Sequence, residues 1–159
     1  METKLRNLLK DSEPKNEEQN QIEEVNTKIG DLVYKDHFKY KGQILNDNIR
    51  DGFGTLKREP EDDDALCFKY EGPFQNDLFG EGPGEMIVYH RGERPLLHYK
   101  GGFKSSQFNQ YGSLVTPDYT YDGHFEEGKK CGTGRIKHPF FCFEGIWHDD
   151  HMQGPGTLV

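Results

Sequence analysis

The sequence predicts an all-β protein: a single-layer antiparallel meander of stacked β-hairpins. Three observations carry this prediction. A short glycine-containing pattern recurs five times, apolar and polar residues alternate within each copy, and 19 of the 159 residues are glycine. Recurrence of a pattern along the chain is typical of repeat architectures, and strict alternation is typical of half-buried strands.

The first half of each copy predicts a strand with one buried face. It opens with an aromatic residue that is followed two residues later by glycine. The residues two before and four after this aromatic are also apolar, whereas those between are mostly polar. Glycine on the apolar face leaves room for a neighbouring ring. The five leading aromatics are Tyr40, Tyr70, Tyr99, Tyr121 and Phe143.

The second half of each copy predicts the partner strand of a hairpin. It reads glycine, any residue, glycine, any residue, apolar, as in the segment Gly52-Phe53-Gly54-Thr55-Leu56. A polar turn separates the two halves, so successive hairpins are expected to form one meander of ten strands. The glycines expected to have a structural role are Gly42, Gly54, Gly72, Gly84, Gly101, Gly112, Gly123, Gly134, Gly145 and Gly156.

The spacing of the copies divides the chain into a repeat domain, residues 37–159, and an N-terminal arm, residues 1–36. Repeats start near residues 38, 68, 97, 119 and 141, and their leading aromatics are 30, 29, 22 and 22 residues apart. The extra residues of the first two copies fall in connecting loops at 59–64 and 89–95. Such insertions usually lie on one side of an array.

The arm breaks the repeat pattern and is expected to be partly helical. Ser12 and Pro14 make a plausible helix start, and Gly30 a plausible end. Four apolar residues follow this start at helical spacing and are expected to form a docking segment. They are Ile22, Val25, Ile29 and Leu32.

Composition excludes several classes of function. The net charge of −8 divides into −3 for residues 1–36 and −5 for the rest, so no segment has the basic excess that nucleic acids require. The chain has no apolar stretch long enough for a signal peptide or a membrane span. Three cysteines without CxxC spacing, Cys67, Cys131 and Cys142, indicate reduced thiols of a soluble cytoplasmic protein.

No pattern in the chain predicts catalysis, and no cofactor or metal is expected. The acidic run from Glu59 to Asp64 lacks the glycine and the spaced ligands of a calcium loop. His148 and His151, with Asp149 and Asp150 between them, are expected to form an exposed turn and not a zinc or nickel site. The glycine pairs lead into strands, whereas phosphate binding needs a helix start.

The repeated pattern resembles the MORN repeat (membrane occupation and recognition nexus) over about residues 38–159. There are departures: Gln110 replaces one glycine, Phe143 replaces the leading tyrosine, and the first two copies have an extra residue before the glycine pair. The resemblance implies a non-enzymatic scaffold or adaptor that joins a larger protein assembly, here most simply a ciliary or flagellar axoneme of the cytoskeleton. Such families have no catalytic residues to transfer.

A single sheet leaves its apolar face without a second layer, so a partner helix, or the chain's own arm, is expected along that face. The ring residues expected to line this groove are Tyr70, Phe74, Tyr99, Phe103, Tyr121, Phe125 and Trp147. Open strand edges near Phe38 and Leu158 are expected to favour partner strands or self-association.

Two alternative functions remain open from sequence alone. A peripheral membrane tether would bind anionic lipids through the basic residues of the third and fourth copies, whereas a regulatory subunit would form a complex with an enzyme. These basic residues are Lys100, Lys104, Lys129, Lys130, Arg135 and Lys137.

Overall fold

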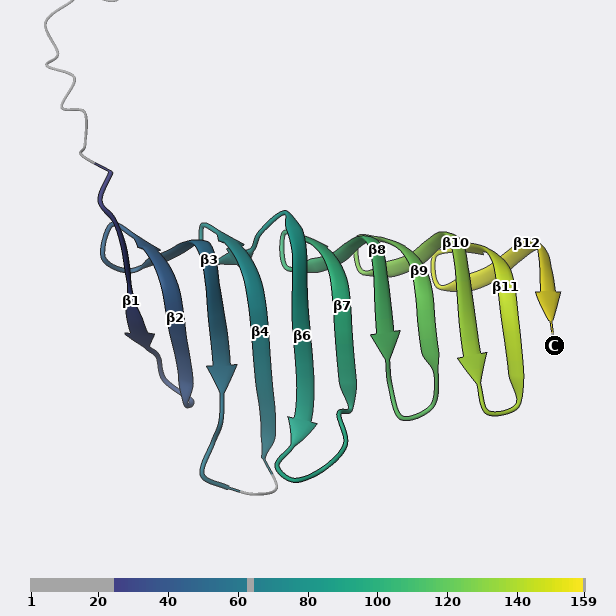
Figure 1. Ribbon diagram of the computed structural model, residues 1–159, viewed down its shortest axis with the longest axis horizontal. Helices are drawn as coiled ribbons and strands as arrows, with labels where there is room; N and C mark the ends of the chain where they lie inside the picture. Colours follow the sequence, from purple (N-terminus) through teal and green to yellow (C-terminus); the bar gives the residue numbers. More distant parts are fainter. Residues whose placement is uncertain (1–24, 63–64, 159) are drawn as a thin grey trace, which may run out of the picture.

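The computed structural model describes residues 25–62 and 65–158, and within these residues every regular element is a strand. The strands form one antiparallel sheet that extends as a long ribbon (Figure 1). They are β1 (Thr27–Val33), β2 (Phe38–Leu45), β3 (Ile49–Arg58), β4 (Leu66–Gln75), β5 (Leu78–Phe79), β6 (Gly82–His90), β7 (Leu97–Lys104), β8 (Gln107–Val115), β9 (Thr120–Glu126), β10 (Lys129–His138), β11 (Phe141–His148) and β12 (His151–Leu158).

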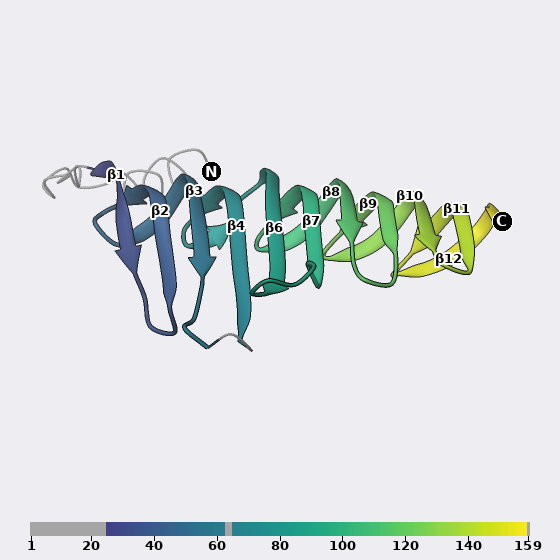
Figure 2. The ribbon, with the colours of Figure 1, turned by 60° about the horizontal axis from the view of Figure 1, so that its bottom comes forward.

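The order of the strands confirms the predicted meander. Eleven strands follow one another across the sheet in chain order, and the two-residue β5 lies off this path and pairs with β4. Each strand packs chiefly against its two neighbours, so the ribbon grows in one direction as a repeat array does (Figure 2).

Type I′ turns close the hairpins. At each tip two successive residues have positive φ, as at Asn46 (49°) and Asp47 (67°) or at Glu127 (48°) and Gly128 (80°). This backbone geometry matches the twist of the flanking strands, and Asn, Asp and Gly adopt it at least cost. The polar turns of the sequence therefore specify where each hairpin reverses.

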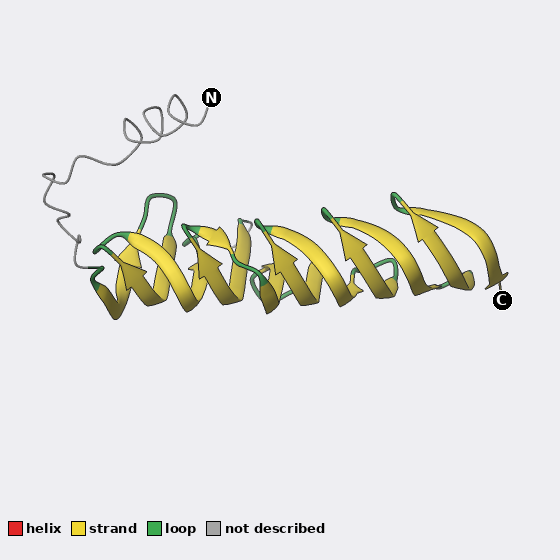
Figure 3. Ribbon diagram, turned by 90° about the horizontal axis from the view of Figure 1, so that it is seen from above, coloured by secondary structure: helices red, strands yellow, loops and turns green. Residues whose placement is uncertain are grey.

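The hairpins bend toward one side of the sheet, which we call the inner face. Bulges shift the register between Gly42 and Ile44 and between Gly101 and Phe103, and a bulge bends its strand. Seen from above, the hairpin ends run obliquely across the ribbon (Figure 3). The hydrophobic core lies on this inner face, and the opposite side is the outer face.

Neighbouring tips are tied together by a repeated set of hydrogen bonds. The backbone N–H of Asp77 donates to the carbonyl of Arg50 (2.9 Å), and the N–H of Asp150 donates to the carbonyl of Lys130 (3.0 Å). The N–H of Arg50 in turn donates to Oδ1 of Asp77 (2.9 Å). Each tip is thus held by the unit before it, which keeps the hairpins in register.

The predicted helix is wrong for the part of the arm that the structure describes. Thr27–Val33 is the strand β1, which pairs with β2 in the register Gly30–Gly42. The three residues Lys28, Gly30 and Leu32 match the second half of a repeat, with lysine in place of the first glycine. The edge expected near Phe38 is therefore covered. Ile22 lies outside the described residues.

Both long loops lie on the same side of the array, as their length predicted (Figure 1). They connect β3 to β4 and β6 to β7 at the end of the sheet opposite the hairpin tips. The Arg91 guanidinium donates a hydrogen bond to the carbonyl of Pro60 (2.5 Å), so the two loops contact each other. The insertions therefore do not disturb the core.

Candidate functional site

A straight row of glycines crosses the sheet and positions the core rings. Eleven strands each contribute one glycine at this level: Gly30, Gly42, Gly54, Gly72, Gly84, Gly101, Gly112, Gly123, Gly134, Gly145 and Gly156. Ten of them are the predicted structural glycines. Gly30 was missed because the sequence placed it at a helix end.

Each leading ring lies across the glycine row, in the space that the missing side chains leave. A Cβ at Gly134 would lie 2.5 Å from Cζ of Tyr121, and a Cβ at Gly72 would lie 2.6 Å from Oη of Tyr70. The phenol then bonds the backbone three residues ahead: Oη of Tyr99 donates to the carbonyl of Gly102 (2.9 Å). Glycine and tyrosine at this spacing therefore form one packing unit.

The predicted groove residues form the core and not an accessible surface. Tyr70, Tyr99 and Tyr121 are fully buried, and Phe74, Phe103, Phe125 and Trp147 are at most 4% exposed. Their rings meet edge to face across successive hairpins, as Tyr70 and Phe103 do at 5.0 Å between centroids. The prediction that a partner contacts these seven rings is wrong, because the hairpin tips bend over them.

On the inner face, the apolar surface that does remain open lies beside the core, at the start of each repeat. We call it the apolar ledge; its members, each packed against the core and half-buried, are Phe38, Phe68, Leu97, Tyr119 and Phe141. At its N-terminal end a hollow of about 460 Å³ lies between Phe38, Phe68, Phe79 and Val88, among other residues. This hollow is almost entirely lined by apolar side chains.

In the first four repeats the second residue of the strand after the turn completes the core, a role that sequence reasoning missed. Phe79 and Phe108 stack on the leading rings Tyr70 and Tyr99, each at 3.8 Å between centroids. The equivalent positions hold Arg50 and Lys130 in the first and fourth repeats. The common spacing of nine or ten residues from the leading aromatic could have revealed the position, but its mixed chemistry hid it.

The two cations at this position lie over aromatic rings. The Lys130 ammonium lies 5.1 Å from the centroid of Tyr119 and 5.9 Å from that of Trp147, and 3.6 Å from an Asp150 carboxylate oxygen. Arg50 lies 5.4 Å from the centroid of Phe74. A cation in this setting is stabilised both by the ring quadrupole and by its carboxylate partner.

The remaining arm residues do not occupy the inner face as a helix. Ile29 is 81% exposed and Val25 is exposed as well, whereas Leu32 is half-buried against the core. Alternation along β1 explains the difference, because successive side chains of a strand point to opposite faces. Of the docking residues that the structure describes (Val25, Ile29 and Leu32), Leu32 is therefore the one that contacts the core, and it does so as part of the sheet.

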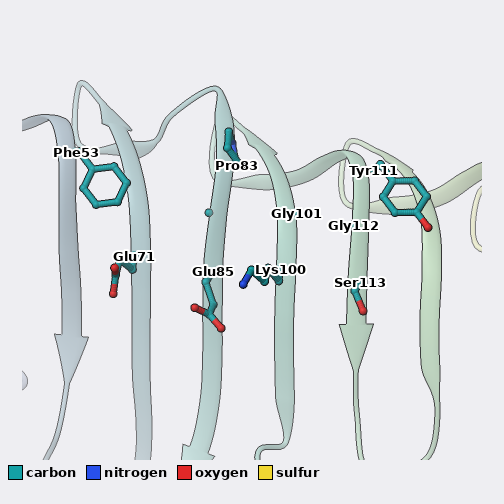
Figure 4. A pocket seen from close by; sticks show the side chains of 10 residues that line it. Phe53, Glu71, Pro83, Glu85, Lys100, Gly101, Tyr111, Gly112 and Ser113 are labelled. Atoms are coloured by element: carbon teal, nitrogen blue, oxygen red, sulfur yellow. The ribbon is translucent and has the colours of Figure 1, made fainter.

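A second hollow lies on the outer face, where the sequence predicted mostly polar residues. Figure 4 shows its ends marked by the rings of Phe53 on β3 and Tyr111 on β8. Its volume is about 450 Å³, and the backbone of Gly84, Gly101 and Gly112 forms part of its lining. Both rings occupy the variable slot directly before the second glycine position of a repeat (Gly54 and Gly112), which the alternation pattern treated as solvated.

The ionisable groups of the core are phenols, and burial governs them. Desolvation raises the pKa of Tyr40 and of Tyr99 to about 12, and it raises the pKa of Tyr70 and Tyr121 further. A phenol with so high a pKa is neutral at physiological pH. The core tyrosines thus act as hydrogen-bond donors.

The other sequence candidates lie at exposed positions. His148 and His151 flank the last turn, where His151 Nδ1 lies 2.6 Å from the carbonyl oxygen of Asp149. Among residues 25–62 and 65–158, no cluster of three or more His, Cys, Asp or Glu side chains is placed to hold a metal ion. The three cysteines are free thiols, and Cys67 is buried.

Comparison with protein-family models and with curated protein sequences finds no match to this chain. Within the part of the chain that the structure describes, no helix has the length and apolarity to cross a bilayer.

Proposed function

We propose that this chain is a non-enzymatic scaffold or adaptor of the MORN-repeat kind, which docks a partner protein on its apolar ledge. The observation that carries the proposal is the hollow beside Phe38 and Phe68. It is apolar and open, and the described residues provide no second layer over it. Exposed apolar surface of this kind marks interaction sites in soluble proteins.

The shape of the ledge favours an amphipathic helix as the partner segment. The ledge runs across the strands, so a segment lying on it cannot extend the backbone ladder and must bind through side chains. A helix does this with apolar residues at positions i, i+3, i+4 and i+7. Arg58 lies 5.9 Å from the centroid of Phe68's neighbour Phe38, so an acidic residue beside the partner's apolar stripe would meet its guanidinium.

The assembly we propose is a ciliary or flagellar axoneme, and the resemblance to MORN repeats is the support for this choice. The test is purification of the tagged chain from ciliated cells, with quantitative mass spectrometry of the proteins that accompany it. We expect a set of subunits in stoichiometric amounts together with tubulin. Recovery of one catalytic subunit instead would favour a regulatory subunit of an enzyme.

Matched variants connect this test to the ledge. Phe68→Ser removes a ring from the ledge, and Ile146→Ser removes a half-exposed apolar side chain from the outer face. We expect Phe68→Ser to lose the stoichiometric partners and Ile146→Ser to retain them. Both variants should show a cooperative thermal unfolding transition, which establishes that each is folded. Retention of the partners by a folded Phe68→Ser variant would refute docking at the ledge.

A membrane tether is a second candidate, favoured by one feature of the outer face. Lys39, Lys57 and Lys69 lie directly opposite one another on β2, β3 and β4, although like charges in this arrangement are destabilising. An anionic lipid surface would neutralise them. Within this row Lys69 is also paired with Glu71 (2.9 Å), and Lys129 and Lys130 of the basic cluster singled out in the sequence are paired with aspartates. Sedimentation of the chain with anionic vesicles would support the tether if it weakens with added salt and is lost when Lys39, Lys57 and Lys69 are changed to glutamine.

A further inference from the structure

The outer hollow has two walls of different chemistry. One wall consists of the uncharged residues Phe53 on β3, Pro83 on β6 and Tyr111 on β8. Pro73 lies opposite Phe53 in the register of β3 and β4, next to this wall. The rings are prominent, with Phe53 58% and Tyr111 59% exposed. Aromatic and proline side chains that stand out of a sheet offer flat apolar contacts without polar competition.

The other wall is charged and contains two adjacent carboxylates. Glu71 and Glu85 lie opposite each other on β4 and β6, and Lys100 stands opposite Glu85 on β7 (Figure 4). His98 Nε2 lies 2.7 Å from Oε1 of Glu85, and this hydrogen bond lowers the pKa of Glu85. Lys69 approaches Glu71 at 2.9 Å. A carboxylate accepts about four hydrogen bonds, so both can take a further donor.

The direction of the hollow restricts the backbone that can fill it. The hollow crosses the strands, whose N–H and C=O groups already bond within the sheet, so a ligand there cannot join as another strand. A polyproline II segment has no such requirement, because its backbone is solvated and its conformation is preformed. Aromatic-lined grooves bind segments of this kind in several peptide-recognition domains.

The spacing of the rings fits the period of that conformation. Phe53 and Tyr111 are separated by four strand-to-strand steps, from β3 through β4, β6 and β7 to β8, which is about 19 Å at about 4.8 Å a step. Two turns of polyproline II, six residues at about 3.1 Å each, also span about 19 Å. Glu85 stands on β6, midway between the rings.

We propose that this outer hollow, which we call the outer trough and define by Phe53, Pro83, Tyr111, Glu71 and Glu85, binds a proline-rich segment of a partner protein. Prolines six residues apart stack on the two rings, and an arginine or lysine about midway between them pairs with the two glutamates. This surface is separate from the apolar ledge. Its occupation goes beyond the proposed scaffold function and makes the ribbon a two-sided adaptor.

The test is titration of the full-length chain with three acetylated peptides, followed by NMR or calorimetry. The first is Pro-Pro-Ala-Arg-Ala-Ala-Pro-Pro, the second has glutamate in place of arginine, and the third lacks the two alanines after arginine. We expect the first to bind and the other two to bind at least about tenfold more weakly, a change of about 1.4 kcal/mol in binding free energy.

Variants locate the site. Phe53→Ser and Tyr111→Ser should each weaken the first peptide at least about tenfold, the scale of one stacking contact. Glu71→Gln with Glu85→Gln should remove the preference for arginine over glutamate. Ile146→Ser, an apolar-to-polar change on the outer face beyond this trough, should leave affinity within about twofold, since surface changes away from a site usually act weakly. Melting temperatures establish that each variant is folded.

Several outcomes would overturn the proposal. They are no binding of the first peptide by the wild-type chain, equal binding of all three peptides, and binding that the two ring variants leave unchanged. Anionic vesicles provide the remaining comparison: if these bind through Phe53 and Tyr111 while the peptides do not, the surface contacts lipid and the proposal fails. None of these results bears on docking at the ledge, which the Phe68→Ser purification tests separately.

Discussion

Gly134→Ala tests the packing unit of tyrosine and glycine. The added Cβ would lie 2.5 Å from Cζ and 2.7 Å from Cε2 of Tyr121, and closer still to its hydroxyl oxygen. Real Cβ atoms do not come so near, so the fully buried ring must move and strain its hydrogen bond to the carbonyl of His124 (3.1 Å). Overpacking of this kind costs about 1–3 kcal/mol in free energy of unfolding.

Gly84→Ala is the matched control, since it makes the same change in the same row. There the nearest atom of Tyr70 is 3.0 Å from the added Cβ. Replacing a strand glycine by alanine gains about 0.5–1 kcal/mol from the unfolded chain, which offsets much of so small a strain. We expect a loss of about 2 kcal/mol for Gly134→Ala and a change near zero for Gly84→Ala.

Urea unfolding, with fluorescence as the signal, measures both variants. Trp147 is the single tryptophan, and its ring centroid lies 5.2 Å from that of Tyr121, so it reports on this region. In thermal unfolding, a loss of about 2 kcal/mol corresponds to a fall of about 4–8 °C for a domain of this size.

A double mutant identifies the cause. Tyr121→Leu shortens the side chain and removes the atoms that the new Cβ would meet. In that background we expect Gly134→Ala to be neutral or stabilising, with a coupling free energy of at least about 1.5 kcal/mol. Additive effects, or Gly134→Ala within about 0.5 kcal/mol of wild type, would refute the account of ring and glycine as one unit.

Three further predictions concern the tyrosines and β1. Tyr99→Phe should lower the free energy of unfolding in urea by about 1–2 kcal/mol, because the buried carbonyl of Gly102 loses its hydrogen-bond donor. Phe143→Tyr should not lower it, and an equal loss in both variants would contradict this prediction. Burial raises the pKa of Tyr40 and Tyr99 to about 12, so their contribution to stability is full below about pH 10 and is lost as pH rises through about 12. Phenolate absorbance should therefore appear together with unfolding, and ionisation of the core phenols in a still-folded chain would contradict this prediction. Leu32→Ser should lower the free energy of unfolding by about 1–2 kcal/mol and Ile29→Ser by less than about 0.5 kcal/mol, because of these two residues only Leu32 packs on the core. Equal effects of the two substitutions would contradict the assignment of β1 as a strand.

The sequence predicted the repeat domain well because two independent signals coincide there. Alternation around Tyr40, Tyr70, Tyr99 and Tyr121 indicated the buried face, and the polar turns indicated the reversals. Both follow from local geometry, namely the period of two in a strand and the left-handed residues of a tight turn. A meander of hairpins then requires no long-range information.

The errors share a different cause, since they concern positions where the period alone is ambiguous. Val25, Ile29 and Leu32 satisfy a helical spacing, yet Gly30 and Leu32 also match the last residues of a repeat, and pairing with β2 decides between the two. The groove prediction treated the inner face as open, because sequence does not reveal that the hairpin tips bend over the rings. Phe53 and Tyr111 went unnoticed, since their slot holds unlike residues in different copies.

The glycine row has a consequence for how such a chain can change over generations. Because every unit meets the next through the same glycine level and the same tip contacts, a stretch such as the 22 residues from Tyr121 up to Phe143 could be duplicated or deleted and its flanks would still fit together. Length thereby becomes a quantity that selection can adjust in steps, each adding two strands and about 10 Å, without redesign of the remaining units.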